Sequence, residues 1–324
     1  MSKYIWDEKN RYDLATIPDE NVKEGGQGNV YLLGNQLCIK VLKEPDDFTI
    51  QLTIIGKILN HPTKPYEHVK AVGTVPKGLI WDENKKIVGY TMEQLLGWHG
   101  LHEIITEADS ETLGVDLKSS GLILAALSRA TRLIHSQGFV IGDFNPSNIL
   151  FKEERGQFLV KFIDTDSWSI YRHDLDIEYA SKVLDIGTIY YPDVIQANKD
   201  GKPWPNFTPN HDWWAFVYIS WMILTKFDPY QTGAVGDIDK EERILENHTA
   251  NRAATVRLHP EFGPATQALG PKLRFYLDRC LKRKVRRPFP TKVLQDFANN
   301  LRLCPCGFEA HASAVLCPSC AQLL

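Results

Sequence analysis

The feature that most constrains the fold of this chain is a pair of short apolar segments that each border a polar side chain. Ile149-Leu150-Phe151 follows Asn148, and Val160-Lys161-Phe162-Ile163 precedes Asp164. Their apolar character and short separation predict two strands joined by a turn. Such a hairpin would direct Asn148 and Asp164 into one cleft, and Asp143 lies five residues before Asn148.

These three polar side chains have the chemistry that phosphoryl transfer requires. A carboxylate such as Asp143 can accept or orient an attacking hydroxyl group. The oxygens of Asn148 and Asp164 are of the kind that magnesium prefers, and magnesium neutralises nucleotide phosphates. The sequence therefore predicts Asp143 as a catalytic residue, and Asn148 and Asp164 as catalytic residues that hold magnesium.

Length and charge narrow the class of protein. The 324 residues suit one large two-lobed domain with a small appendage, and a hydrophobic content of 43 % supports a full core. The net charge of −3 argues against a general nucleic-acid binder. The basic run at 279–287 is better explained as a solvated helix end with one structural arginine than as a nucleic-acid patch.

No segment predicts secretion or membrane insertion. The first residues lack the apolar core of a signal peptide. The longest apolar run, 213–224, is too short to cross a bilayer and suits a buried helix. Four of the six cysteines lie within the last 21 residues instead of being spread as a disulfide framework. We therefore expect a cytoplasmic protein without a membrane partner.

The pattern of apolar residues divides the chain into a strand-rich and a helix-rich part, which predicts an α+β fold. Residues 20–95 hold strand-like runs and one helical segment at about 47–60. Beyond Ser119 helical spacing dominates, with a helix at 121–137 ended by Gly138 and a last helix at 291–303. We expect a small lobe at 1–92, a larger lobe at 93–300 and a tail at 301–324. The strand-like runs are 30–33, 37–42, 78–81 and 87–92.

A glycine-rich segment predicts contacts with phosphates, and a strand lysine after it needs a polar partner. Gly25, Gly26 and Gly28 come just before a predicted strand, and glycines let backbone N–H groups approach phosphates closely. Lys40 follows within Cys-Ile-Lys-Val. An ammonium group among strand apolar residues needs a partner, because burying it unpaired is costly.

The tail predicts a metal site. Cys304 and Cys306 form one pair and Cys317 and Cys320 another, each in a turn with Pro or Gly. Two such pairs suit one tetrahedral zinc ion, whose closed shell would be structural. His311 lies between the pairs, but four thiolates already fill the shell. We expect a zinc-ribbon-like tail.

Residues 20–300 resemble bacterial eukaryotic-like Ser/Thr protein kinases. The branch that is most similar occurs in three-gene systems with a von Willebrand factor A-type protein and a metal-dependent phosphatase, linked to tellurite resistance. The resemblance implies a bilobal protein-kinase-like fold. The matching motifs are the Gly-Asp…Asn loop with Asp143, the Asp-Thr-Asp motif at 164–166, Pro192-Asp193, His211-Asp212, Cys280-Leu281 and Arg286-Arg287-Pro288.

The resemblance also implies an activity and its cofactors. Such enzymes use ATP and magnesium to transfer the γ-phosphoryl group to Ser/Thr hydroxyls of protein substrates. Lys40 would hold the α- and β-phosphates. The A-type protein and the phosphatase are the partners that the resemblance implies. The residues expected to bind the cofactor are Gly25, Gly26, Gly28, Val30, Lys40, Met92, Glu93 and Leu95.

Some positions depart from the kinase pattern in the catalytic machinery. Lys23 stands where the family usually has its first glycine. Gly142 replaces the arginine before the catalytic aspartate, and Asn145 replaces the lysine after it. That arginine usually pairs with an activation-segment phosphate, so activation by phosphorylation of this segment loses its main anchor.

The usual partner of the strand lysine is also missing. Segment 46–62, where the family has a helix glutamate, contains none. Either Gln51 or Asp164 is then expected to hold Lys40, or the active pairing is absent.

The activation segment differs as well. Thr188 lies four residues before Pro192, where six are expected for the threonine that contacts the catalytic aspartate. The arginine of 286–288 should pair with Asp193.

Two alternative functions stay open. A pseudokinase, meaning a nucleotide-binding scaffold, is favoured by the missing glutamate, glycine and lysine. A small-molecule phosphotransferase is favoured by Gly142 and opposed by Pro192-Asp193 and Asp212. The presence of Lys40 together with the catalytic and magnesium residues favours the active protein kinase.

Overall fold

The computed structural model describes residues 4–34, 36–172, 177–180, 191–230, 239–249, 262–282 and 290–324. The chain forms two compact units of an α+β protein, as the sequence predicts for the fold class. Unit one comprises 1–98, 133–141 and 161–182, and unit two comprises 99–132, 142–160 and 183–324. Unit one includes the residues of the predicted small lobe, 1–92, together with segments of the predicted larger lobe, and unit two includes the residues of the predicted tail. Among the described residues, no helix combines the length and apolarity that a bilayer crossing requires.

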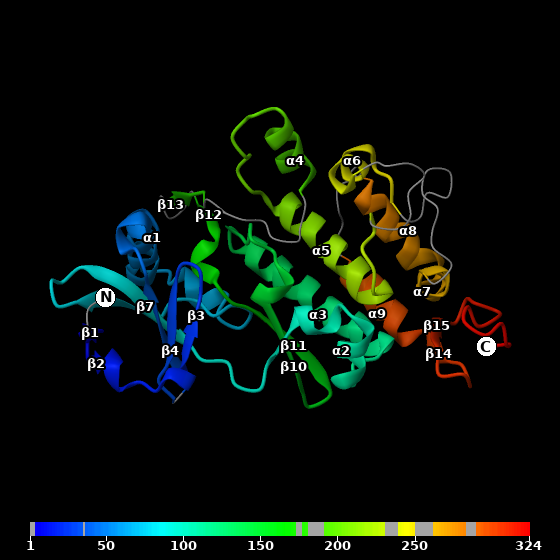
Figure 1. Ribbon diagram of the computed structural model, residues 1–324, viewed down its shortest axis with the longest axis horizontal. Coiled ribbons are helices and arrows are strands. Elements are labelled where there is room, and N and C mark those ends of the chain that lie inside the picture. The colour runs from blue at the N-terminus through cyan, green and yellow to red at the C-terminus, as the bar shows by residue number, and fades with distance from the viewer. Residues whose placement is uncertain are drawn as a thin grey trace. The chain divides into compact units, whose positions relative to one another are not determined.

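Unit one is built on an antiparallel sheet in the order β2-β1-β6-β7-β5-β4-β3 (Figure 1). All four strands that the sequence predicts are present. Strands β1, β2 and β3 were not predicted, and β3 pairs with β4 around the glycine-rich segment. The strands are β1 Tyr4–Trp6, β2 Arg11–Asp13, β3 Val22–Glu24, β4 Gly28–Leu32, β5 Leu37–Leu42, β6 Gly78–Asp82 and β7 Ile87–Glu93.

Helix α1, Thr49–Asn60, packs on one face of this sheet and buries its apolar stripe there (Figure 1). Leu52 and Ile55 of the helix join Leu42 and Tyr90 of the sheet in one hydrophobic cluster. A second cluster, around Ile39, fills the opposite side of β5. Because β5 is covered on both faces, nearly all of its side chains are buried, which places its lysine in an apolar surrounding.

A smaller sheet completes unit one. It has the order β13-β12-β9, with β9 Phe139–Val140, β12 Ser169–Arg172 and β13 Ile177–Tyr179. Phe139 stacks on Tyr66 at a centroid distance of 5.9 Å and meets Trp168 edge-on at 5.8 Å. This aromatic packing holds the turn before Trp168 against the rest of the unit.

Unit two is mainly helical. Its central helix α5, Pro209–Thr225, is buried along its length, as its apolar run predicts. Helix α3, Leu117–Ser136, begins four residues before the predicted start, and Gly138 follows its end with a φ of 76°. The other helices are α2 Glu107–Thr112, α4 Pro192–Lys199, α6 Lys240–Glu246, α7 Gly263–Ala268, α8 Gly270–Leu281 and α9 Thr291–Asn299.

The predicted hairpin is present as β10 Ile149–Glu154 and β11 Gln157–Phe162, with β8 His99–Gly100 on the other side of β10. Arg155 and Gly156 form its turn, and both have positive φ values, 52° and 75°. The last two residues of β11 belong to unit one, so the chain passes between units within this strand.

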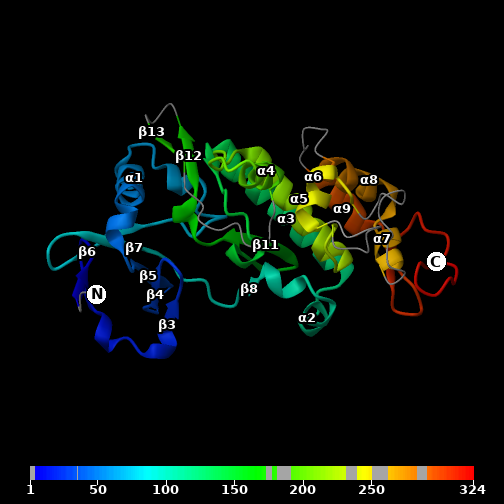
Figure 2. The same cartoon turned by 45° about the horizontal axis from the view of Figure 1, so that its top comes forward.

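The prediction of one helix over 291–303 was wrong at its end. Helix α9 stops at Asn299, and 301–303 form β14, Leu301–Leu303, which pairs with β15, Glu309–His311. The strand replaces the last helical turn because the backbone pairs with β15 and thereby brings the first cysteine pair into a hairpin turn. In Figure 2 this C-terminal segment follows α9 and lies beside α7.

Candidate active site and cysteine cluster

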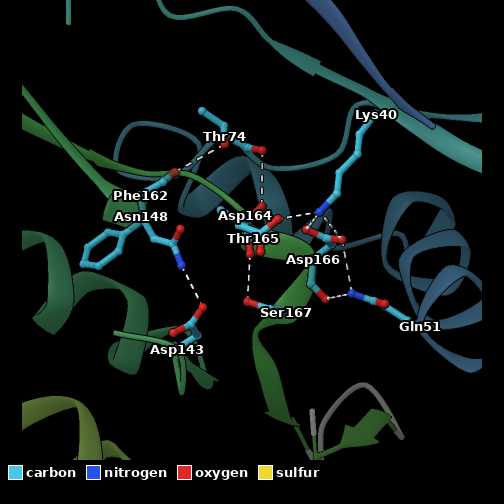
Figure 3. A network of polar contacts seen from close by, with 10 residues as sticks. All are labelled: Lys40, Gln51, Thr74, Asp143, Asn148, Phe162, Asp164, Thr165, Asp166 and Ser167. Atoms are coloured by element: carbon cyan, nitrogen blue, oxygen red, sulfur yellow. Dashed lines mark hydrogen bonds and ion pairs between the residues drawn. The ribbon is translucent and has the colours of Figure 1, made fainter. Parts of the chain in front are cut away.

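Lys40 lies in the middle of β5 and is 5 % exposed. Its ammonium group donates hydrogen bonds to the carboxylate of Asp164 and to both carboxylate oxygens of Asp166, at 3.1 and 3.0 Å (Figure 3). The Tyr90 ring on the neighbouring β7 lies 5.9 Å from the amine. The expected contact between Lys40 and Asp164 is present, and Asp166 is a second partner that the sequence analysis missed.

A short turn presents the two carboxylates to the same amine. Asp164 has a left-handed backbone, with φ 56° and ψ 39°, and the 3₁₀ turn Thr165–Ser167 follows it. The hydroxyl of Ser167 donates to the Asp164 carbonyl at 2.8 Å. The Thr165 hydroxyl donates to the Thr74 carbonyl at 3.2 Å, so both ends of the turn are fixed. A signal for Asp166 was available, because it is the second acid of Asp-Thr-Asp.

Gln51 projects from α1 toward the same turn and is buried. Its amide nitrogen donates to the main-chain carbonyl of Asp166 and, at 3.2 Å, to the Asp166 carboxylate (Figure 3). From the sequence, Gln51 was one of two predicted direct partners of Lys40. The contacts of its amide instead reach Lys40 indirectly, through Asp166.

The two carboxylates differ in burial and in proton affinity. The Asp164 side chain is 31 % exposed, whereas that of Asp166 is 1 % exposed. Burial and the neighbouring Asp166 raise the pKa of Asp164. Burial also acts to raise the pKa of Asp166, but the charge of Lys40 and a hydrogen bond from Tyr90 outweigh it and lower this pKa. Of the two carboxylates, Asp166 therefore holds a proton less readily than Asp164.

The amine responds to the same charges. Burial acts to lower the pKa of Lys40, but Asp166 and Asp164 outweigh this effect and raise it. Lys40 is thus held as an ammonium ion.

The second group of predicted residues lies in unit two, on the loop before β10. Asn148 donates from its amide nitrogen to the Asp143 carboxylate at 2.8 Å, which leaves the Asn148 amide oxygen outside this bond (Figure 3). Asn145 caps the 3₁₀ turn Pro146–Asn148, because its side-chain oxygen accepts from the Ser147 N–H at 2.9 Å. The residue that replaces the usual lysine therefore shapes the loop.

Gly142 is held from both of its backbone groups. Its N–H donates to the fully buried Asp212 carboxylate at 2.9 Å, and its carbonyl accepts from the Tyr191 hydroxyl at 3.0 Å. Its φ is 70°, a conformation that favours glycine. Asp212, at the start of α5, thus fixes the backbone next to Asp143. The left-handed conformation of this backbone explains why residue 142 is a glycine.

Asp193 begins helix α4 and pairs with His211 of α5, with 2.7 Å between the carboxylate and Nε2. This pair and a hydrogen bond from the Thr208 N–H to the other ring nitrogen fix the start of α5. The predicted arginine partner at 286–287 and Thr188 lie outside the described residues.

The predicted cofactor residues all lie in unit one. Gly25 donates its N–H to the Gly28 carbonyl at 2.9 Å, which closes the turn between β3 and β4. A Cβ at Gly28 would lie 2.5 Å from the Val41 carbonyl, so glycine is required there for packing against β5. Gly26 has open space around it. Val30 stands opposite Lys40 in the sheet.

The segment after β7 is held by contacts of two kinds. The Cys38 thiol lies 3.7 Å from the Met92 carbonyl and 3.6 Å from the Glu93 carbonyl. The Glu93 side chain forms an ion pair with Lys161. Leu95 follows in the link to unit two, which begins at His99.

The four tail cysteines form a cluster that can hold a metal ion. Their sulfur atoms all lie within 4.8 Å of one another. Cys304 and Cys320 are 3.6 Å apart and Cys306 and Cys317 are 3.7 Å apart. Four sulfurs bound at about 2.3 Å to one tetrahedral zinc ion would be about 3.8 Å apart. The spacing therefore fits a zinc ion.

The pKa values within the cluster shift in opposite directions. Backbone hydrogen bonds act to lower the pKa of Cys304 and Cys320, but burial and contacts among the sulfur atoms outweigh them and raise it, whereas backbone groups favour the thiolate form of Cys317. Burial acts to raise the pKa of Cys317, but hydrogen bonds from the N–H groups of Cys320 and Ser319 and contacts with other cysteines lower it to about 7. Thiolate is the form that binds zinc.

His311 lies outside the sulfur cluster and has a structural place. Its Nδ1 contacts the Ser313 hydroxyl at 2.9 Å. Its ring stacks on Phe297 of α9 at 6.3 Å, and it fills the space beside Gly270. Glu309 of the same strand accepts from the N–H of Leu117, at the start of α3, at 2.8 Å. These contacts attach the tail to the helices of unit two.

Comparison with known proteins did not identify a relative. No protein-family model matches the chain, and no curated protein matches it.

Proposed function

We propose that this chain is an ATP- and magnesium-dependent protein kinase that transfers the γ-phosphoryl group to Ser/Thr hydroxyls of partner proteins. The observation that carries the proposal is the contact between Lys40 and Asp164, which are 124 positions apart in sequence. Protein kinases use a strand lysine for the nucleotide phosphates and a loop aspartate for magnesium. Two such residues on one buried network support that chemistry.

The loop in unit two supports the proposal independently. The Asp143 carboxylate accepts a hydrogen bond from Asn148. The backbone of the preceding residue, Gly142, is fixed by its hydrogen bond to Asp212. A carboxylate held in this way suits the orientation of a substrate hydroxyl. Each unit therefore contributes its own argument.

The donor sets fit the proposed ions. Asn148 and Asp164 offer an amide oxygen and a carboxylate, which are magnesium ligands, and magnesium would neutralise charge on the transferred phosphate. The cysteine cluster would hold structural zinc. The proposal includes cytoplasmic protein substrates, with the A-type protein and the phosphatase of the resembling systems as partners.

Transfer of labelled phosphate from ATP tests the proposal. The parent should label a partner protein or itself, and Asp143→Ala should lower the rate by about 10²–10⁴ because the oriented hydroxyl is lost. Asp164→Ala should also weaken magnesium-dependent ATP binding. Asp200→Ala, an exposed aspartate of the same unit as Asp143, is the matched control and should retain the parent rate. Unchanged transfer in both Asp143→Ala and Asp164→Ala would refute the proposal.

A nucleotide-binding scaffold is the second candidate. The observation in its favour is that Lys40 occupies the Asp164 carboxylate, the proposed magnesium ligand. A scaffold would bind ATP without transferring phosphate, and its binding would not need Asp143. Binding measurements on the same variants therefore separate the two candidates.

A further inference from the structure

The network around Lys40 contains a carboxylate for which the kinase pattern has no role. Asp166 stands two residues after the proposed magnesium aspartate. We propose that Asp166 is the positioning residue of Lys40, and that Gln51 fixes Asp166 from helix α1. The acid that a protein kinase normally places on the helix has moved to the loop, and the helix contributes an amide instead. The link to nucleotide binding rests on the proposed function, whereas the pairing itself does not.

Contacts from three elements converge on Asp166. Lys40 of β5 binds both carboxylate oxygens, at 3.1 and 3.0 Å. Gln51 of α1 binds one of these oxygens and the main-chain carbonyl. Tyr90 of β7 contributes a hydrogen bond to the same carboxylate. These hydrogen bonds fix the position of the carboxylate, and the carboxylate in turn fixes the position of the amine.

The two acids beside Lys40 are suited to different tasks. Asp166 has its carboxylate enclosed, whereas Asp164 is nearly one-third exposed. If Asp164 bound a metal ion, the amine would keep Asp166 as its counter-charge. This is needed because a buried ammonium without a partner is costly.

A direct metal-binding role for Asp166 is the competing explanation. Its carboxylate oxygens already accept hydrogen bonds from Lys40 and Gln51. A metal ion at Asp166 would have to displace these donors, whereas Asp164 can offer an oxygen toward solvent. The geometry therefore favours Asp166 as a positioning residue.

The reactivity of Lys40 makes the proposal measurable. The groups that face its amine are Asp164 and Asp166 on the turn and the Tyr90 ring on β7, and Tyr66 stands near Asp166. An amine-directed acylating reagent reacts with an amine that has been released from its carboxylate partners. The rate at which Lys40 is acylated at pH 8, quantified by mass spectrometry of its peptide, thus reports how firmly these partners hold it.

The variants separate the two acids. Asp166→Asn keeps the shape but removes the charge, and it should raise the Lys40 acylation rate about tenfold or more, because the amine loses the carboxylate that accepts two of its charge-assisted hydrogen bonds. Asp164→Asn is the matched control and should raise the rate less, because its carboxylate is more exposed. Gln51→Glu combined with Asp166→Asn returns a carboxylate to the helix and should bring the rate back toward that of the parent.

Folding is monitored by thermal unfolding of each variant. Gln51→Met retains both carboxylates and should raise the rate a few-fold because Asp166 loses its support. This variant tests the proposal even if Asp166→Asn does not fold.

Three outcomes would overturn the proposal. These are a parent-like rate in folded Asp166→Asn, a larger increase in Asp164→Asn than in Asp166→Asn, and an unchanged rate in folded Gln51→Met. Protection of parent Lys40 by ATP and magnesium tests the proposed function separately. If ATP and magnesium did not protect Lys40, nucleotide binding at this lysine would be refuted, whereas its pairing with Asp166 would stand.

Discussion

The Lys40 network and the cysteine cluster are assembled in opposite ways. The Lys40 network joins β5, α1 and the turn after β11, with sequence separations of 115 to 126 between partners. The cysteine cluster uses a single short segment, 304–320. One arrangement needs the fold of a whole unit, and the other needs two adjacent turns.

The difference extends to how the groups are satisfied. In the Lys40 network the ammonium ion forms ion pairs with two carboxylates. An amide and a phenol form hydrogen bonds to one of these carboxylates. In the cysteine cluster four sulfur atoms face one another, and a cation would compensate them as thiolates. The side chains of the first site compensate one another, whereas the four sulfur atoms of the second could hold a metal ion, on which we expect the fold of the tail to depend.

Among the tests of this comparison, metal removal should have the largest effect on the structure. Purified protein should contain about one zinc ion per chain, and a strong chelator should remove it and unfold the tail, because structural zinc supplies the folding free energy of such segments. Hydrogen exchange should show lost protection at Gly307 and Ala321, whose amides close the two cysteine turns. The Thr74 amide in unit one is the internal control and should keep its protection. Metal-free protein with a protected tail would contradict the dependence on an ion.

Loss of the amine from the self-contained network should be the next largest effect. Lys40→Met leaves Asp166 ionised and buried without its cation, and it should lower the free energy of unfolding by about 3–5 kcal/mol. Lys40→Met combined with Asp166→Asn should recover part of this loss, since the uncompensated charge is gone. Denaturant unfolding at neutral pH measures both. A Lys40→Met variant as stable as the parent would show that the charges of this network are not mutually dependent.

The smallest effect on stability is expected where the segment of the cysteine cluster contacts the helices. His311→Ala should leave the zinc content unchanged and lower the free energy of unfolding by about 1 kcal/mol, the usual value of an aromatic contact. Elemental analysis and denaturant unfolding give the two numbers. Cys317→Ser is the contrasting variant and should lose the metal. Lost zinc in His311→Ala would mean that the ligand set is wrong.

Local sequence signals were sufficient where one element determines its own structure. Helix α1 and strands β5 and β7 follow from the spacing of their apolar residues, and the cysteine cluster follows from two pairs in adjacent turns. Asn148 and Asp143 lie on one short loop, so their contact could also be expected.

Signals that depend on distant contacts were not readable in advance. Strands β1 and β2 have three residues each and exist through their pairing in the sheet. The second acid of Asp-Thr-Asp is visible in the sequence, but its contact with Lys40 depends on the left-handed backbone of Asp164, which no residue pattern specifies. The predicted last helix was too long, because 301–303 continue its apolar pattern but pair with β15.

The left-handed backbone at Gly142 limits how this protein can change by single substitutions. Installing the arginine that many kinases use as an anchor for a phosphorylated loop would place a side chain at a φ of 70°, at a cost of about 1–2 kcal/mol. The new residue would still need its N–H on Asp212 and its carbonyl on Tyr191. If the chain is a kinase, control through such an anchor cannot be gained in one mutational step without strain. The loop around Gly142 is fixed instead by the hydrogen bonds that its backbone already forms.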